Sequence, residues 1–431
     1  MKTRLLALLC LSMLLLPAAA RASFIYTPNT YGLSARGAAL GNALTGDGGD
    51  IAAEYYNPAG LAYPVPSQIG VGYLYGRPFL AGGLVGGDRV RENESNRIGT
   101  FATRVNVTNL FQDTVPLPPI GFGFSVAVDN NFFTMMAFDD MRTSRGDFLR
   151  YGLANLVMQG ALAVGVADWL SVGVGFHGGF RGNGEVETIA DVNGSTANEG
   201  TRMRGHNHPV PLAGLFFHGR TWGLGLTYRE ETYGGFESIE VTATPALYGT
   251  PLATMHIPMD FVDTFVAREA AVGVSWDVLP RWKLLVDGSW RNWSRFDNVF
   301  EENHFVGSHS RFTTIDLWTP RIGSEVEVFD NFVVRGGYRF EQTPFHTIGT
   351  RYPYPDHTIK GTVILDADTH VGSAGVGWRL HSPEVLKHDL VFDAAYQLHY
   401  LVPREAQTSD GYTFHSEGTV HLFAAGMRIE F

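Results

Sequence analysis

Apolar and polar residues alternate along most of the chain after residue 66. In the segment WGLGLTYRE (residues 222–230), leucine and aromatic side chains occupy every second position, and glycine, threonine and arginine lie between them. The same period of two recurs in residues 333–340 and 388–402. A period of two places alternate side chains on opposite faces of a β-strand, so one face meets an apolar medium and the other something polar. The pattern predicts an all-β protein.

Fourteen strands are expected, and several of them are too long for an ordinary soluble sheet. Strands of soluble proteins usually have about 5–6 residues, whereas a tilted strand needs about 9–11 residues to cross a bilayer. The expected strands lie near residues 67–76, 119–128, 131–139, 156–167, 170–181, 206–217, 221–230, 263–278, 282–295, 312–328, 332–341, 366–380, 387–402 and 415–431.

Long and short connections alternate between these strands. The long connections are residues 77–118, 140–155, 182–205, 231–262, 296–311, 342–365 and 403–414. Most of the others are tight turns such as Asp129-Asn130 and Asp168-Trp169. An even-stranded antiparallel meander with short periplasmic turns and long outer loops is typical of an outer-membrane barrel. Tryptophans near strand ends suit its aromatic girdles, namely Trp276, Trp282, Trp290 and Trp293.

The first 22 residues have the features of a secretory signal peptide. A basic start precedes the apolar run LLALLCLSMLLL (5–16), and residues 20–22 (ARA) fit a cleavage site. We therefore expect the mature chain to begin at Ser23. Because the single cysteine, Cys10, lies inside the signal, we expect no disulfide, cysteine nucleophile or thiolate metal site in the exported chain.

Composition narrows the remaining classes. Without the signal, 29 basic and 43 acidic residues give a formal net charge of −14, which disfavours a nucleic-acid ligand. The 51 glycines and 13% aromatic residues are high for a soluble globular protein. No apolar run of about 18 residues follows the signal, so no membrane-spanning helix is expected. A soluble all-β exported protein and a membrane β-barrel remain, and the alternating connection lengths favour the barrel.

Residues 23–66 form a separate N-terminal segment ahead of the barrel strands. It contains EYYNPAGLAYP (54–64), where Pro58 fixes its own φ and moves Asn57 out of the helical region, which predicts a turn. Small residues between 32 and 43 allow short helices to pack closely. The segment lacks the polarity of a disordered tail. We expect a signal peptide at 1–22, an ordered N-terminal domain at 23–66 and a barrel at 67–431.

The mature chain resembles the FadL/TodX family of outer-membrane transporters for hydrophobic compounds. The most specific stretch is YGLSARGAALGNALTGDGGDIAAEYYNPAGLAY (31–63), with small-residue helices, an acidic turn and the Asn-Pro-Ala signature. Residues 289–299, 338–378 and 414–431 also resemble the family's strand ends, a Pro-containing loop and the closing strand. The resemblance implies a 14-stranded antiparallel transmembrane β-barrel whose N-terminal segment is a hatch inside the lumen. The hatch motif would be Asn57, Pro58, Ala59, Gly60 and Leu61.

The resemblance also implies a route for the ligand. Loops 182–205 and 231–262 would capture hydrophobic molecules, the hatch would move, and the ligand would leave sideways through the wall. The lateral gate would lie in the third strand, NFFTMMAF (131–138), at Phe132, Phe133, Met135 and Met136. An ordinary lipid-facing strand surface is the alternative for these four residues.

Candidate ligand contacts are mostly apolar. The second capture loop carries residues too apolar for a solvated loop, which marks a binding surface or loop-on-loop packing. They are Leu247, Tyr248, Leu252, Met255, Ile257 and Met259. Arg181 lies close to a basic position of the family and could pair with a carboxylate. The family's second basic position falls near Leu317, a departure that leaves carboxylate recognition open, and the inward Arg335, Arg339 and Arg379 suit a wetted wall.

Other motifs in the chain do not indicate catalysis or a bound cofactor. Residues 173–178 match GxGxxG, but a strand continues where a dinucleotide fold needs a helix. His206 and His208 have no third metal ligand nearby in sequence, and Asp47 and Asp50 suit a helix-linking turn. No GxSxG motif occurs. We expect no catalytic residue, metal site or cofactor.

The sequence therefore predicts a monomeric outer-membrane barrel that imports hydrophobic molecules by passive diffusion. Long-chain fatty acids are the leading ligands, and aromatic or alkane hydrocarbons, a general porin or structural barrel, and a lipid hydrolase are the alternatives. Expected partners are the hydrophobic ligand, outer-membrane lipids and lipopolysaccharide. The terminal Phe431 resembles the signal that the barrel assembly machinery reads, although a soluble protein can also end in Phe.

Overall fold

The structure, a computed structural model, describes most of the chain after Tyr26. The described residues are 19–20, 26–86, 89–92, 95–111, 117–129, 138–139, 146–148, 151, 156–191, 196–248, 250–296, 309–310, 314–345, 350–351, 363–382, 387–407 and 413–431.

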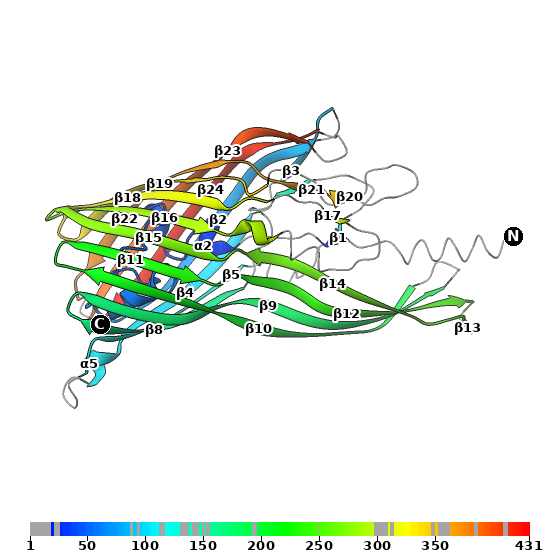
Figure 1. Cartoon of the computed structure of the whole chain (residues 1–431), viewed down its shortest axis with the longest axis horizontal. Helices are drawn as coiled ribbons and strands as arrows, with labels where there is room; N and C mark the ends of the chain where they lie inside the picture. The colour runs from blue at the N-terminus through cyan, green and yellow to red at the C-terminus, as the bar shows by residue number, and fades with distance from the viewer. Residues whose placement is uncertain are drawn as a thin grey trace.

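Fourteen antiparallel strands of the described chain form the wall of a closed barrel (Figure 1). The first and last wall strands close it, from Gln68 opposite Glu430 to Leu84 opposite Phe414. The fold class and strand number predicted from sequence are confirmed. The wall strands are β2 (Gln68–Leu84), β4 (Asn96–Asn106), β5 (Ile120–Asp129), β8 (Val157–Ala167), β9 (Leu170–Asp191), β10 (Thr196–His218), β11 (Trp222–Arg229), β15 (Glu269–Leu279), β16 (Trp282–Arg291), β18 (Leu317–Phe329), β19 (Phe332–Glu341), β22 (Thr369–Leu380), β23 (Asp389–Gln407) and β24 (Thr413–Glu430).

Two strand assignments made from sequence were wrong. Residues 96–106, expected within a loop, form the second wall strand, and β5 is the third, paired with β4 and β8. Of the expected third strand 131–139, Phe138–Asp139 pairs with Ala19–Ala20 and not with the wall. The segment NFFTMMAF has consecutive apolar residues and no alternation. The strand β4 was missed because Phe101 is its only exposed large apolar side chain among the described residues.

Short elements lie outside the wall. They are β1 (Ala19–Ala20), β3 (Arg89–Glu92), α5 (Val107–Phe111), β6 (Phe138–Asp139), β7 (Gly146–Phe148), η2 (Trp293–Arg295), β17 (His309–Ser310), β20 (Thr350–Arg351) and β21 (Val363–Leu365). None of the helices in the described chain is long and apolar enough to cross a membrane.

The wall has an apolar outer face and a polar inner face. On β16, Val286 points outward and is 48% exposed, whereas its neighbour Asp287 and then Ser289 point inward and are buried. Trp276 and Trp282 are exposed beside a tight turn, as expected for an aromatic girdle. Trp293 does not belong to that girdle, because it begins η2 and is buried in the interior.

Residues 26–63, here called the lumenal segment, pack inside the barrel (Figure 1). Nearly all of their side chains are buried. The helix α3 contacts the wall strands β19, β22, β23 and β24, and η1 contacts β4, β5, β8, β9 and β10. The segment therefore touches the wall around most of its circumference. Its elements are α2 (Thr27–Thr30), α3 (Ala35–Ala39), α4 (Ala53–Tyr56) and η1 (Pro58–Ala62).

Glycines on the inner face of the wall make room for this segment. At several wall positions a Cβ would overlap atoms of residues 41–61, among them Gly121, Gly173, Gly214, Gly225 and Gly337. At Gly225 the overlap would be with the Thr45 carbonyl oxygen, and at Gly173 with the main chain of Pro58 and Ala59. At Gly121, Gly173, Gly225 and Gly337 the contacts involve main-chain atoms, so no rotamer change can relieve them.

One buried arginine of the wall also holds several turns of the lumenal segment. Arg104 on β4 is 1% exposed, and the hydrogen bonds that its guanidinium donates within the described residues all go to main-chain carbonyls of this segment. The acceptors include Asp50 at 3.2 Å, Gly60 at 2.7 Å and Tyr63 at 3.0 Å. These carbonyls are buried away from water, so the arginine satisfies groups that would otherwise be costly to bury.

We expect Gly225→Val to displace the lumenal segment while the barrel still forms. Overpacking costs about 1–3 kcal/mol, which favours the displaced state by roughly 5–150-fold. Ion conductance of the purified protein in a planar bilayer measures this as a higher open probability. Gly288→Val is the matched control, because nothing lies within 4 Å of a Cβ at Gly288. Equal conductance of the two variants would contradict the prediction.

We expect Arg104→Met to loosen the same segment by leaving its carbonyls without donors. A loss of about 2 kcal/mol accelerates amide exchange by roughly 30-fold. Hydrogen–deuterium exchange of residues 44–63 measures this rate in detergent. Arg97→Met on the same strand is the control, because Arg97 is exposed. Unchanged exchange in the Arg104 variant would show that these hydrogen bonds do not hold the segment.

Candidate functional site

A sheet of four strands continues beyond the barrel at the end where the connections are long (Figure 1). It has the order β10-β9-β12-β14, and β12 (Thr232–Leu247) lies parallel to the outer part of β9. The strand β14 (Met255–Val266) returns the chain to the wall. Capture loops predicted from sequence therefore include long strands that extend the wall outward.

The apolar candidates of the second loop gather toward the tip of this sheet, beside β13 (Thr250–Pro251). Leu247, Tyr248 and Leu252 are 42%, 81% and 58% exposed, so packing between loops does not account for them. Tyr248 has φ 48°, in the left-handed region. Met255 is partly exposed on β14. The backbones of Ile257 and Met259 lie farther along β14, opposite Val241 and Ile239.

Arg181 is far from this apolar tip. On β9, Arg181 lies opposite Gly235 of β12, whereas Ala246, next to Leu247, lies opposite Asp191. Arg181 and Asp191 are ten residues apart on β9, which corresponds to roughly 33 Å along a strand. Arg181 and the tip therefore do not form one site. The candidate gate residues Phe132, Phe133, Met135 and Met136 lie outside the described residues.

The hatch motif forms a compact turn against the wall. The Asn57 side chain accepts a hydrogen bond from the Ala59 N–H at 3.1 Å and donates to the carbonyls of Thr45 and Leu215, each at 3.0 Å. Leu215 belongs to β10, so this asparagine joins two parts of the lumenal segment to the wall. Pro58 begins η1, and Gly60 and Leu61 are buried within it.

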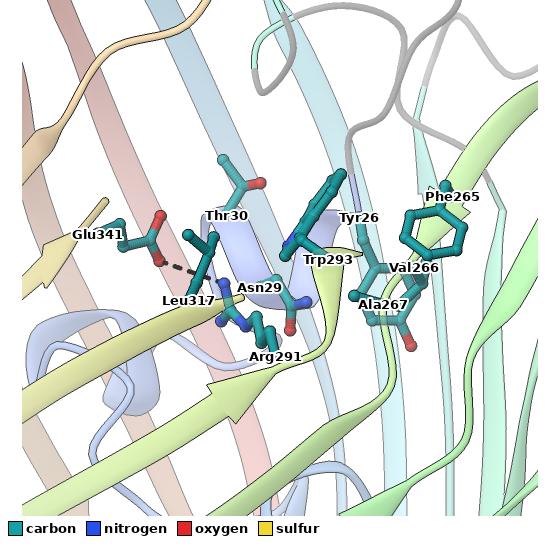
Figure 2. Close-up of a pocket in the computed structure, with 10 residues that line it drawn as sticks. All are labelled: Tyr26, Asn29, Thr30, Phe265, Val266, Ala267, Arg291, Trp293, Leu317 and Glu341. Carbon is teal, nitrogen blue, oxygen red and sulfur yellow. Dashed lines mark ion pairs between the residues drawn. The ribbon is translucent and has the colours of Figure 1, made fainter. Parts of the chain in front are cut away.

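An apolar cap covers the start of the lumenal segment. Phe265, Trp293, Phe296 and Phe345 pack with ring centroids 5.3–5.9 Å apart, and each is at most 9% exposed. Beneath this cap lies a cavity of about 30 Å³, enough for about one water molecule (Figure 2). Its lining residues are Tyr26, Asn29, Thr30, Phe265, Val266, Ala267, Arg291, Trp293, Leu317 and Glu341.

Buried charges adjoin the cavity on its inner side. We call them the arginine cluster: Arg229, Arg291, Arg321, Arg339, Glu269 and Glu341, each at most 8% exposed. Glu269 lies 3.0 Å from Arg229, 3.5 Å from Arg321 and 3.6 Å from Arg291. Glu341 lies 3.1 Å from Arg339 and 3.9 Å from Arg291. Four cations thus share two carboxylates.

The cluster has more hydrogen-bond donors than acceptors. Within the described residues, Arg229 Nε, Arg291 Nε and Nη2, and Arg321 Nε have no hydrogen-bond partner. Asp287 interacts electrostatically with Arg321; its Oδ2 accepts the Thr45 N–H at 2.8 Å, and its Oδ1 has no hydrogen-bond partner among the described residues. Even counting Asp287, the cations remain in excess among the residues that the structure describes. A buried excess of guanidinium groups favours an anion that can accept their hydrogen bonds.

Figure 2 shows that Arg291 joins the cluster to the cavity. It extends from the end of β16 towards Glu341, among Leu317, Asn29 and Trp293. A second cavity, of about 20 Å³, lies between α2, α4 and the wall and is lined by Arg229, Glu269 and Arg321 among others. The cluster therefore lies between two small cavities, and the apolar cap adjoins the outer one.

Sequence reasoning found only part of this site. Arg339 was considered as wetted wall, and Leu317 as a departure from the family, yet both adjoin the site. Arg229, Arg291 and Glu269 were missed as a group. The register between neighbouring strands would have identified this group, because Glu269 on β15 lies directly opposite Arg229 on β11 and Arg291 on β16.

The remaining inward arginines considered from sequence, Arg335 and Arg379, form ion pairs with wall carboxylates. Arg335 lies 2.6 Å from both Glu325 and Asp393, and Arg379 contacts Asp389 and Glu430. In the part of the chain that the structure describes, no group of three or more His, Cys, Asp or Glu residues could hold a metal ion.

Comparison with known proteins identifies the family. A family model described as "Outer membrane protein transport protein (OMPP1/FadL/TodX)" matches residues 16–431. The chain is 24% identical to alkane uptake protein A of Marinobacter nauticus, over 93% of this chain and 90% of that protein. Its fold is similar to a crystal structure of a Pseudomonas aeruginosa FadL homologue, with TM-score 0.62, 16% identity, and coverage of 95% of this chain and 100% of that one.

A second solved structure has the same fold. The toluene transporter TodX of P. putida aligns with TM-score 0.53 and 12% identity, over 93% of this chain and 99% of that one. The resemblance found in the sequence and the outer-membrane location inferred from it are confirmed. This chain belongs to the FadL/TodX family of outer-membrane transport proteins for hydrophobic compounds.

Proposed function

We propose that this protein takes up amphiphilic molecules with a carboxylate head and an apolar tail, long-chain fatty acids above all, by passive diffusion. The observation that carries this proposal is the arginine cluster beside the apolar cap. Its four N–H groups that make no hydrogen bond among the described residues suit a carboxylate, and the rings of Phe265 and Trp293 suit the start of a hydrocarbon chain. A hydrocarbon alone would leave those donors without an acceptor.

Capture would begin at the outer sheet. The exposed Leu247, Tyr248 and Leu252 form an apolar tip, to which Met255, Ile257 and Met259 would add along β14. Transfer of a chain from water to apolar contacts is favourable by about 0.8 kcal/mol for each CH₂ buried. Arg181 lies on the path from the tip to the barrel and would be a secondary contact for the head group.

The lumenal segment would act as the hatch. Tyr26, Asn29 and Thr30 line the outer cavity, which holds about one water, so a ligand can enter only if this segment moves. Exit through the wall into lipid avoids carrying an apolar tail through water. For that step, Phe132, Phe133, Met135 and Met136 remain the proposed gate. Contacts with outer-membrane lipid and lipopolysaccharide, and assembly through Phe431, are proposed with it.

An uptake channel for alkanes or aromatic hydrocarbons is the second candidate. The relative from M. nauticus is named for alkane uptake and the TodX structure for toluene transport. The exposed apolar tip serves either ligand class equally well. The two candidates differ at Arg291, which a hydrocarbon would not need.

We expect Arg291→Leu to lower oleate uptake by about 10–100-fold, because it removes a charge-assisted hydrogen bond worth about 1.5–3 kcal/mol. Uptake of hexadecane by the same variant should be unchanged. Both labelled compounds would be followed in a Gram-negative host lacking its own fatty-acid transporter. Arg202→Leu is the control, because the Arg202 side chain is 69% exposed on the outer sheet.

Heat-dependent gel mobility would confirm that each variant forms a barrel. If Arg291→Leu and wild type take up oleate equally, carboxylate recognition at the cluster is wrong. Uptake of hexadecane but not oleate by the wild type would establish the second candidate.

A further inference from the structure

Glu54 is a fully buried carboxyl group where the lumenal segment meets the wall. It lies on α4, which packs against β5 and β8, and is 0% exposed. A Cβ on Gly123 of β5 would lie 3.0 Å from its Oε2 atom. The neighbouring side chains of Leu61, Ala161 and Ala163 form a buried apolar cluster. This carboxyl group is therefore enclosed by the wall on one side and by apolar groups on the other.

The unsatisfied atoms around Glu54 are all acceptors. Among the described residues, neither oxygen of Glu54 nor Oε1 of Gln159 on β8 has a hydrogen-bond partner. Gln159 uses its Nε2 to donate to Ser125 Oγ at 3.0 Å. The Ser125 hydroxyl also acts on Glu54, but it carries a single proton, so a proton on Glu54 supplies a further donor to this group of acceptors. A charged carboxylate in the same place would be buried without a counter-ion.

Few charged groups act on this carboxyl. Among the described residues, Asp50 of the lumenal segment and Arg104 on β4 are the charged groups with the largest influence on it, and the guanidinium of Arg104 donates to main-chain carbonyls. The strand β8 and the helix η1 carry no ionisable residue. The only one on β5 is Asp129, four residues beyond Ser125 and roughly 13 Å along the strand.

Burial dominates the ionisation of Glu54. It raises the pKa of Glu54 to about 8, although Ser125 and Arg104 act in the opposite direction. Asp47 in the same segment behaves differently: burial alone would raise its pKa, but Arg36 and Lys283 lower it to about 2. Within the lumenal segment, Glu54 is therefore a carboxyl group that changes charge near neutral pH when the segment is seated.

We propose that Glu54 is a proton-dependent contact that holds the lumenal segment against β5 and β8, and that loss of its proton releases the segment. This inference rests on the hatch role proposed above. The seated carboxyl keeps its proton up to higher pH than a carboxyl in water, so protons favour the seated state. Seating is strongest below about pH 4.5 and weakens as the pH rises to about 8.

The expected effect is large enough to measure. Between about pH 5 and 8, the ratio of released to seated segment rises about tenfold for each pH unit. Open probability of the purified, full-length mature protein in a planar bilayer follows this ratio. Glu54→Gln keeps the shape of the side chain and supplies a permanent N–H donor. It should stay closed and lose the pH dependence.

Three further proteins make the experiment decisive. Ser125→Ala removes a group that favours the ionised form, so its pH response should move to higher pH. Glu185→Gln is a control, because the Glu185 side chain is 61% exposed on the outer sheet. Deletion of residues 26–63 provides the fully open reference.

The outcomes separate this inference from the proposed function. A wild-type open probability that is flat from pH 5.5 to 8.5, or an unchanged slope in Glu54→Gln, overturns the role of Glu54. If the deletion conducts no better than wild type at any pH, the hatch role itself is wrong. If Glu54→Gln does not form a heat-modifiable barrel, the wild-type curve and the direction of the Ser125→Ala shift decide the question.

Discussion

Hydrogen bonds from inward-facing wall side chains to the main chain of the lumenal segment are the interaction on which the rest of this structure depends. A short irregular segment leaves many N–H and C=O groups without partners of its own, and inside a barrel no bulk water can satisfy them. Arg104, Ser275 and Gln397 donate to its carbonyls, and Asp287 accepts one of its N–H groups. Polar side chains on the inner face of the wall therefore supply hydrogen bonds that a longer helix or a sheet would make within its own main chain.

Close approach is the condition for those hydrogen bonds. Gly173 and Gly214 bring the main chains of β9 and β10 against the Asn57 turn, so that the Asn57 amide reaches the Leu215 carbonyl. Larger residues at these positions would move the turn away and break that contact. Small residues of the segment face glycines of the wall, and both are needed for the two main chains to approach closely. This packing accounts for many of the glycines in the chain.

The barrel could be predicted from sequence, because alternation and turn residues are local signals, whereas the site depends on contacts between distant strands. The turn at Asn57 was recognisable from Pro58 alone. Glu269 is ordinary in sequence, and only its register between Arg229 and Arg291 makes it one carboxylate shared by several cations. The unsatisfied state of Glu54 likewise depends on which wall residues face α4.

The helix α4 connects two places where buried polar atoms lack hydrogen-bond partners among the described residues, namely the arginine cluster and Glu54. The Tyr55 carbonyl accepts a hydrogen bond from Arg229 at 2.6 Å, while the adjacent Glu54 faces Gly123 on the opposite side of the helix. On the proposals above, an anion at the arginine cluster would compete with that carbonyl for Arg229 and so would loosen α4. Loosening would expose Glu54 to water, lower its pKa and release its proton. By linkage, loss of the proton would favour anion binding by the same factor, so that ligand entry and hatch release would form one coupled equilibrium.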